Sequence, residues 1–207
     1  MRVLITGFGP FPGAPFNPSA ALAKALTRRR RPGFAGIERT QHVFATTYAS
    51  VDRDLPKLLT RKPDVVLMFG LAGRRRHLCI ETRARNGISV LFPDASGWRP
   101  QLSAITLRAP AAFKGNAPFA RLLGATRASA VPSRLSRDAG RYLCNYAFWR
   151  GLEHAQNGRP LVQFVHIPLL AGKSSPRRQT GRRARPSTQL LAAAEALLIA
   201  LVAASRR

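Results

Sequence analysis

The sequence predicts one α/β/α sandwich with a mostly parallel central sheet. Short apolar runs rich in β-branched residues alternate with helical patterns along most of the chain, which is the order that parallel sheets produce. The length of 207 residues fits a single domain. The hydrophobic fraction of 45% is enough for one packed core, and no repeat or long linker divides the chain. We therefore expect a single domain over residues 1–207.

The first half of the chain is predicted to hold three strands and two helices. Residues 2–6 form an apolar, β-branched run, as a buried first strand does. After a loop rich in phenylalanine, proline and glycine, Pro18 and Ser19 open a helical pattern that Pro32 closes. The alternation then continues with a strand over 37–46, a helix over 51–59 and a buried strand over 64–69.

The second half continues the alternation with weaker signals. A strand-like run is followed by a looser section with Pro93, Gly97 and Pro100, and then by further helices and strands. A basic stretch without apolar periodicity predicts a surface loop before the last helix. In chain order the expected elements are a strand over 78–85, a helix over 115–126, a strand over 128–132, a helix over 139–155, a strand over 161–167, the basic loop at about 171–186 and a C-terminal helix at about 187–205.

The net charge of +25 comes from 34 basic residues against 9 acidic ones. Such a charge attracts phosphate polymers and anionic membranes. The arginines nevertheless occur mostly as short runs in predicted loops, such as 28–31, 74–76 and 177–185, and not as one stripe with interleaved aromatic residues. This distribution is typical of solvated arginines, so we expect no nucleic-acid partner. A basic protein that binds nucleic acid or another polyanion on the same scaffold is the non-enzymatic alternative.

Three features predict a cytoplasmic protein without a membrane segment. Only two cysteines occur, which is too few for a disulfide framework and fits a reducing compartment. The N-terminus lacks the long apolar core of a secretory signal. The most apolar stretch, over 190–204, contains Glu195 and is shorter than the roughly 20 residues that a membrane span requires. We expect a core-facing helix there.

Three residues could carry chemistry, because open parallel sheets place functional groups beyond the carboxyl ends of their strands. Cys144 lies near the first turns of a predicted helix, where the positive helix end favours a thiolate. His166 lies at the end of an apolar strand, where it could act as the base that activates Cys144. Glu81 stands where a strand usually prefers an apolar side chain, and it could orient the histidine. The plainer alternatives are a buried small cysteine, a hydrogen-bonded core histidine and an ion pair between Glu81 and Arg83.

Neither a metal site nor a cofactor site is predicted. No pair of histidines, cysteines or carboxylates has the spacing of metal ligands. The segment GFGPFPG after the first strand is rich in glycine, but it matches neither the dinucleotide nor the Walker pattern. Its prolines also remove the amide donors that a phosphate cradle needs, which argues against nucleotide binding.

Five segments resemble the pyroglutamyl-peptidase I family, also called pyrrolidone-carboxylate peptidases, in the same order along almost the whole chain. LITGFGPFPGAPFNPS is similar to the family's LxTGFxPFGG followed by an NPS helix start, and PDVVLMFGLAG is similar to PDxxxxxGxAGG. IETRARN resembles the glutamate-bearing ERxAxN motif. DAGRYLCN resembles SAGTxxCN around the nucleophile, and FVHIP is nearly identical to the histidine motif.

The resemblance implies a phosphorylase/hydrolase-like fold and a cysteine-type omega peptidase that needs no cofactor. Its substrates would be peptides with a blocked, pyroglutamyl (5-oxoproline) N-terminus. By this carry-over Cys144 is the nucleophile, His166 the base and Glu81 the orienting acid. The substrate-binding positions implied by the resemblance are Phe8, Phe11, Asn17 and Tyr142.

Two further expectations come from the family. Its members commonly form dimers or tetramers, which implies a homodimer or homotetramer here. The chain also departs from the family pattern, since Pro12 replaces a glycine, Arg75 departs from the AGG turn and Leu91 stands where an arginine is usual. Each of these could reshape the pocket. A thiol hydrolase of altered substrate, or one that has lost its activity, is therefore the second alternative.

Overall fold

The computed structural model describes residues 1–11, 15–129, 131–155, 158–169 and 186–206. Its centre is a six-stranded sheet in the order β2-β1-β3-β8-β4-β7. Neighbouring strands run parallel except β4 and β8, which are antiparallel. The prediction of a mostly parallel central sheet is confirmed. The strands are β1 (Arg2–Phe8), β2 (Glu38–Phe44), β3 (Val65–Leu71), β4 (Leu78–Glu81), β7 (Ser133–Ser136) and β8 (Leu161–Ile167).

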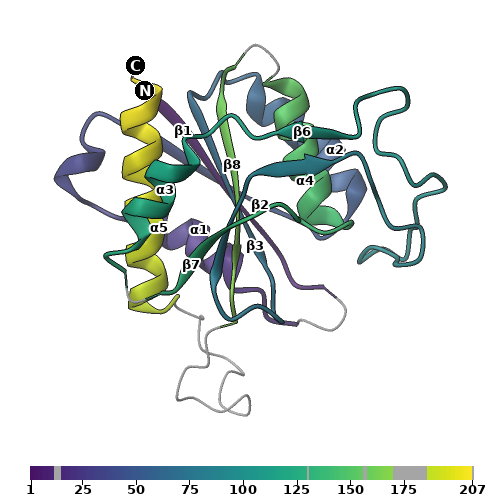
Figure 1. Cartoon of the computed structure of the whole chain (residues 1–207), viewed down its shortest axis with the longest axis horizontal. Helices are drawn as coiled ribbons and strands as arrows, with labels where there is room; N and C mark the ends of the chain where they lie inside the picture. Colours follow the sequence, from purple (N-terminus) through teal and green to yellow (C-terminus); the bar gives the residue numbers. More distant parts are fainter. Residues whose placement is uncertain (12–14, 130, 156–157, 170–185, 207) are drawn as a thin grey trace.

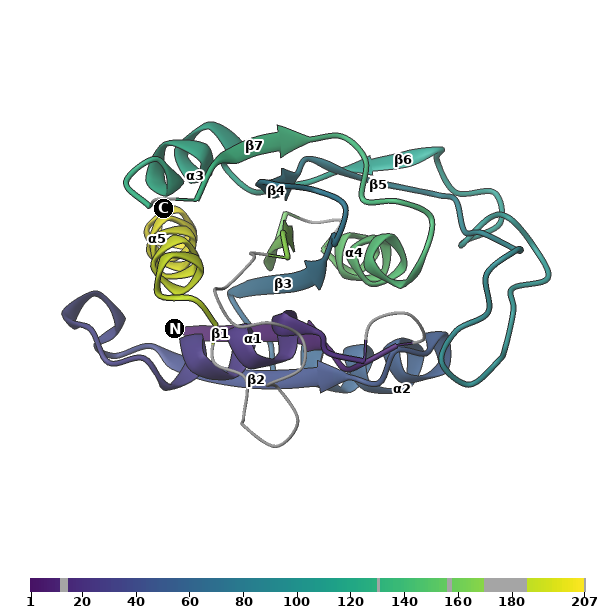
Figure 2. The same cartoon turned by 90° about the horizontal axis from the view of Figure 1, so that it is seen from below.

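Helices cover both faces of this sheet, as Figures 1 and 2 show together. Side chains of a strand alternate between its two faces, so each strand feeds two separate cores. Val3 and Leu67 pack with one set of helices and Leu4 and Val66 with the other. The first set is α1 (Pro18–Arg28), α3 (Phe119–Thr126) and α5 (Thr188–Ser205), and the second is α2 (Tyr48–Leu59) and α4 (Leu143–His154). The predicted α/β/α sandwich is therefore confirmed.

Two strand predictions need correction. The run predicted as one strand over 78–85 divides at Thr82 into β4 and β5 (Arg83–Arg85), and β5 pairs with β6 (Ala112–Lys114) in a separate two-stranded sheet. The strand predicted over 128–132 is wrong, because residues 128 and 129 lie in a turn after α3 and β7 begins at Ser133. β7 is a short edge strand whose residues are half-buried or exposed, so it lacks the apolar run that marks buried strands.

Two helices begin later than predicted. The helix expected over 115–126 begins at Phe119, and the helix expected over 139–155 begins at Leu143. In the second case Gly140 adopts a left-handed conformation with φ of 82°, and Tyr142 is an extended N-cap residue. The late start makes Cys144 the second residue of α4, which places its side chain at the positive end of the helix.

The C-terminal helix α5 is a core helix. Within the described residues it is the one helix whose length and composition alone would let it cross a membrane, with a mean hydropathy of 1.8. A buried helix of a soluble protein meets the same criterion, and α5 packs against α1, α3 and the sheet in one apolar cluster. Its buried Glu195 accepts from both Arg29 and Arg31, so two of the many arginines hold α5 to the segment after α1.

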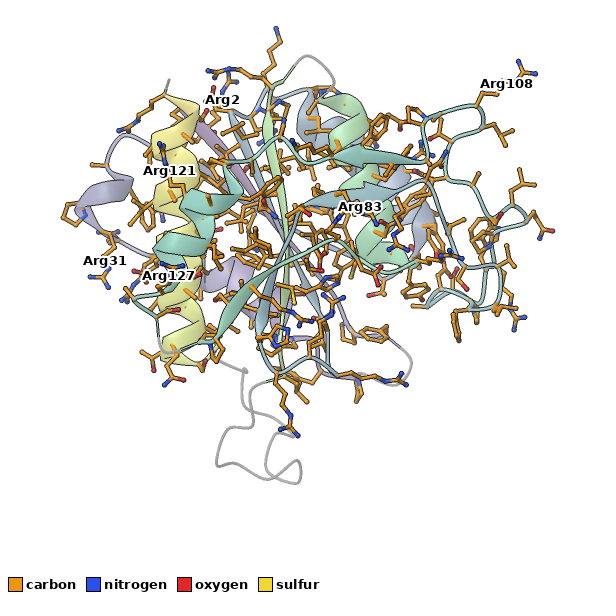
Figure 3. All side chains as sticks on the ribbon, in the orientation of Figure 1. Arg2, Arg31, Arg83, Arg108, Arg121 and Arg127 are labelled. Atoms are coloured by element: carbon orange, nitrogen blue, oxygen red, sulfur yellow. The ribbon has the colours of Figure 1, made fainter. Side chains whose placement is uncertain are left out.

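Most other arginines lie at the periphery of the molecule. Figure 3 shows Arg31 and Arg108 pointing away from the ribbon. Arg2, Arg121 and Arg127 are likewise exposed. Such side chains are solvated and contribute little to a core. Of the basic loop predicted at 171–186, all but Pro186 lies outside the described residues.

Candidate active site

The register of β3 and β8 sets Gly70 beside His166 near the ends of both strands. Cys144 reaches this point from the first turn of α4 and is half-buried. A Cβ atom built on Gly70 would lie 2.7 Å from Cys144 Sγ and 2.7 Å from the ring of Phe164. A glycine is therefore required for the thiol to approach the strand ends so closely.

His166 and Glu81 form a buried pair next to that thiol. Glu81 ends β4, its side chain is fully buried, and its Oε1 lies 2.8 Å from His166 Nδ1. Burial lowers the pKa of His166, but its electrostatic interactions and hydrogen bonds with Cys144 and Glu81 outweigh burial and raise this pKa to about 9. With Nδ1 bound to the acid, Nε2 is the nitrogen left to exchange a proton with a reacting group.

The acid of this pair is held in its ionised form. Burial raises the pKa of Glu81, whereas hydrogen bonding to His166 and Ser136 and the charge of Arg75 lower it, and the net result is a lowered pKa. The three residues predicted to act together, Cys144, His166 and Glu81, thus come from three separate elements and meet in one place.

The four predicted substrate-binding residues have different surroundings. Phe8 ends β1 with 2% of its surface exposed, and its ring packs against Phe44 with centroids 5.6 Å apart. Tyr142, the N-cap residue of α4, donates to the Pro93 carbonyl at 2.9 Å. Phe11 is half-buried, directly before residues that are not described. Phe8 and Tyr142 therefore border the apolar cluster that also contacts Cys144.

Asn17 serves the loop itself. It caps α1 by accepting from the Ser19 amide at 3.1 Å and the Ser19 hydroxyl at 2.8 Å, and it donates to the Gly9 carbonyl at 3.0 Å. The amide thus ties the start of the loop after β1 to the start of α1. In this structure both ends of its side-chain amide are engaged with the chain itself.

Sequence reasoning missed the contacts of two residues of this region. Arg75 was expected only to reshape the pocket mouth, as a departure from the family's AGG turn, whereas its side chain donates to Glu81. It is one of three consecutive arginines, and the sequence does not mark which of them turns inward. Tyr48 begins α2 and its ring lies edge-on to those of Tyr142 and Trp98, with centroids 5.8 Å and 5.5 Å away. The sequence showed Tyr48 only as an aromatic residue near the start of a helix, and such residues are too common to indicate a site.

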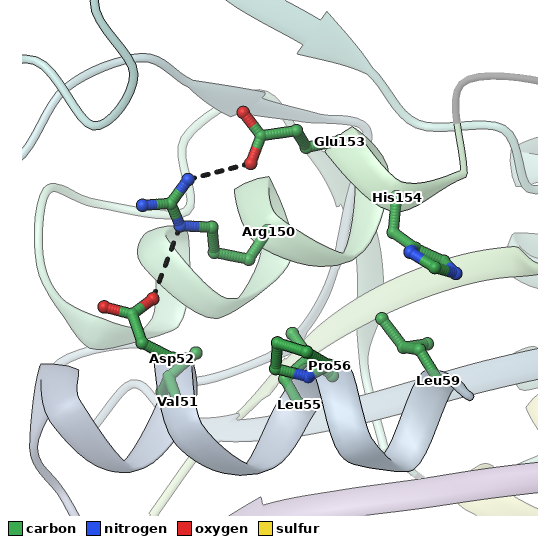
Figure 4. Close-up of a pocket in the computed structure, with 8 residues that line it drawn as sticks. All are labelled: Val51, Asp52, Leu55, Pro56, Leu59, Arg150, Glu153 and His154. Atoms are coloured by element: carbon green, nitrogen blue, oxygen red, sulfur yellow. Dashed lines mark hydrogen bonds and ion pairs between the residues drawn. The ribbon is translucent and has the colours of Figure 1, made fainter. Parts of the chain in front are cut away.

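A hollow of about 310 Å³ lies between α2 and α4 (Figure 4). Its one arginine pairs with both of its acids, since Arg150 Nε lies 3.5 Å from Asp52 and Arg150 Nη1 lies 2.8 Å from Glu153. None of the three triad candidates lines it. In the described part of the chain, no three metal-binding side chains come together.

A helix-terminal thiol beside a buried histidine and carboxylate, at the strand ends of an α/β/α sandwich, is the arrangement of a thiol hydrolase of the cysteine-peptidase class. The comparison with known proteins narrows the class. Residues 1–207 match the family described as Pyroglutamyl peptidase, and the chain belongs to this family.

Relatives along the whole chain agree with this assignment. Pyrrolidone-carboxylate peptidase 1 of Ralstonia nicotianae is 34% identical over 209 residues, covering 99% of this chain and 93% of its own. Pyrrolidone-carboxylate peptidase of Gloeobacter violaceus is 34% identical over 82% of each chain. A mutant pyrrolidone carboxyl peptidase of Pyrococcus furiosus has a similar fold, with a TM-score of 0.82 and 28% identity over 98% of this chain and 99% of its own. Bacillus amyloliquefaciens pyroglutamyl peptidase I has a similar fold too, with a TM-score of 0.77 and 28% identity, and the match covers 100% of this chain and 97% of its own.

Proposed function

We propose that this chain is a cysteine-type omega peptidase that removes pyroglutamate from the N-terminus of peptides. Cys144 is the nucleophile, His166 the base and Glu81 the acid that orients it. The single observation that supports these roles best is the buried contact of 2.8 Å between Glu81 Oε1 and His166 Nδ1. This contact lies next to Cys144, whose thiol is at the N-terminus of α4, in a chain of this family.

The reaction needs two steps. The Cys144 thiolate attacks the carbonyl carbon that follows the lactam ring, the peptide C–N bond breaks, and the leaving nitrogen takes its proton from His166 Nε2. A thioester then joins the acyl group to Sγ. Water attacks it, giving one proton back to His166, so free pyroglutamic acid leaves and the thiolate–imidazolium pair is restored. Glu81 stabilises the imidazolium that is present before the first step and forms again during the second.

The oxyanion that forms in each step needs donors that no other group occupies. No side chain in the described residues caps α4, because its N-cap residue Tyr142 makes no such hydrogen bond. The first-turn amides around Cys144 are therefore available as oxyanion donors, and the helix dipole adds to their effect.

The pyroglutamyl ring is small, flat and uncharged, so aromatic faces and backbone groups can select it without a charged side chain. The half-buried Phe11 and Tyr142 provide the aromatic surfaces in this proposal, and the buried Phe8 contributes by packing against Phe44. Asn17 contributes through the loop, because its bonds to Gly9 and Ser19 fix the path of the chain between Phe8 and α1. The partners are peptides with a pyroglutamyl N-terminus. A cytoplasmic location and a homodimer or homotetramer stay predictions.

The purified protein is expected to release the fluorescent amine from pyroglutamyl-aminomethylcoumarin but not from prolyl-aminomethylcoumarin. The two rings have the same size, but the prolyl ring carries a charged amine and lacks the lactam carbonyl, so an apolar aromatic pocket rejects it. Initial rates at matched concentrations make the comparison. A folded protein that cleaves neither compound would contradict the proposal and favour an altered substrate or a lost activity.

Gly70→Ala is expected to lower kcat/KM by about 100-fold, because a shift of about 1 Å in a reacting group costs that much. The added methyl group would lie 2.7 Å from Cys144 Sγ, so the thiol must move. Gly73→Ala is the matched control, since nothing lies within 4 Å of its Cβ position. Equal activity of both variants would show that the thiol does not need its place beside β3.

A further inference from the structure

Arg75 joins three segments behind the triad candidates. It lies in the turn between β3 and β4, where its Nη1 donates to Glu81 Oε1 at 2.9 Å and to Ser136 Oγ at 3.3 Å. Its Nη2 donates to the Asp138 carbonyl at 2.7 Å. The neighbouring Arg74 and Arg76 are exposed, so only the middle arginine of the run turns inward.

Glu81 therefore receives two donors on the same carboxylate oxygen. His166 Nδ1 lies 2.8 Å from Oε1, and Arg75 Nη1 lies 2.9 Å from it. The two donors come from separate segments and fix the position of that oxygen. A fully buried carboxylate is costly to ionise without a cation, and the histidine can supply positive charge only while it is protonated. The arginine supplies it at every pH.

We propose that Arg75 is a positioning residue of the catalytic site, which keeps Glu81 ionised and holds its Oε1 in place to accept from His166. This inference rests on the proposed function, in which Glu81 orients the base. Arg75 acts only through Glu81 and does not touch the substrate. Its effect is to extend the working range of the triad toward low pH, because Glu81 stays an anion there.

The charges around Glu81 support this assignment. Burial raises the pKa of Glu81, and the contact with His166 and the charge of Arg75 are among the causes that lower it. The opposite shift is expected when the guanidinium is removed. The titratable groups near this pair are His166 on β8, Cys144 on α4, Cys79 on β4 and His77 in the turn before β4.

The test measures how the alkylation rate of Cys144 by iodoacetamide depends on pH in the intact protein, with the labelled residue identified by mass spectrometry. In Arg75→Gln the acid limb of this profile is expected to move to higher pH by about one unit. Without the guanidinium, Glu81 takes up its proton at a higher pH, and the neutral acid no longer stabilises the thiolate–imidazolium pair. Arg75→Lys keeps the positive charge, so the acid limb should stay at its wild-type pH. Arg74→Gln removes the same charge from an exposed neighbour and should leave it unchanged.

Steady-state kinetics add a second measurement. A group that only positions the base should lower kcat by about tenfold in Arg75→Gln while KM changes little. An unmoved acid limb in Arg75→Gln, or an equal shift in Arg74→Gln, would overturn the proposal. If Arg75→Gln does not fold, the Arg75→Lys variant tests the proposal instead. Lysine keeps the positive charge, so a shift of the acid limb in this variant would also overturn the proposal. Alkylation needs no substrate, so failure to cleave pyroglutamyl compounds and failure of this inference are separate outcomes.

Discussion

Cys144→Ala is expected to lower kcat/KM for pyroglutamyl-aminomethylcoumarin by about 10⁴-fold or more, because the covalent intermediate can no longer form. Alanine keeps the helix and removes only Sγ, and the thiol is half-buried, so folding should survive. Cys79→Ala is the matched control, since Cys79 is the only other cysteine and is fully buried in β4. We expect that control to keep most of its activity.

The comparison of the two cysteine variants separates two explanations. If activity is lost in Cys144→Ala but not in Cys79→Ala, Cys144 is the nucleophile. Equal loss in both would point to a general weakening of the fold, which a thermal melt of each variant would reveal. Full activity in Cys144→Ala would contradict the assigned nucleophile, although the membership of the chain in the family would stand on its whole-chain match.

The long buried strands could be predicted to within two residues at each end. β1, β3 and β8 each consist of seven residues, nearly all buried, and such strands give continuous apolar, β-branched runs in the sequence. The edge strand β7 and the pair β5 and β6 have three or four residues each, with polar and charged side chains. Their pairing depends on neighbours in space, so the sequence pattern carries no signal for it.

Strand direction was the other feature that the sequence could not give. β4 runs antiparallel to β8, with Cys79 opposite His166, and this register brings the end of β4 back over the middle of β8. Glu81 follows Cys79 by two residues, so it lies on the same face of the sheet as Cys79, diagonal to His166. The pairing of acid and base depends on this register, for which the sequence pattern carries no signal.

The site itself could be proposed only from joint motifs. Considered singly, Cys144, His166 and Glu81 each had a plainer structural reading, and the resemblance to the family linked them. The sequence pointed to Arg75 only as a departure from the family's AGG turn. Its contact with Glu81 could not be predicted, because its side chain differs from those of Arg74 and Arg76 only in where the turn after β3 directs it.

Glu81→Gln is expected to lower kcat/KM by about 10³-fold and to move the alkaline limb of its pH profile to lower pH. The wild-type limb should lie near the His166 pKa of about 9, because activity requires the imidazolium that protonates the leaving amine and is lost as that proton dissociates. Glutamine has no negative charge to stabilise the imidazolium, so this pKa falls. Its neutral amide also leaves the guanidinium of Arg75 without a counter-charge.

Glu153→Gln is the matched control for that measurement, because Glu153 is also an arginine-paired acid, on α4, but it faces the hollow of Figure 4. It should leave the alkaline limb unchanged. The direction of the shift distinguishes the two charges that meet at Glu81 Oε1. Removing the anion lowers the alkaline limb, whereas removing Arg75 raises the acid limb, so the two variants narrow the active range from opposite sides. An alkaline limb that stays near pH 9 in Glu81→Gln would mean that another group stabilises the imidazolium, and Glu81 would lose its assigned role.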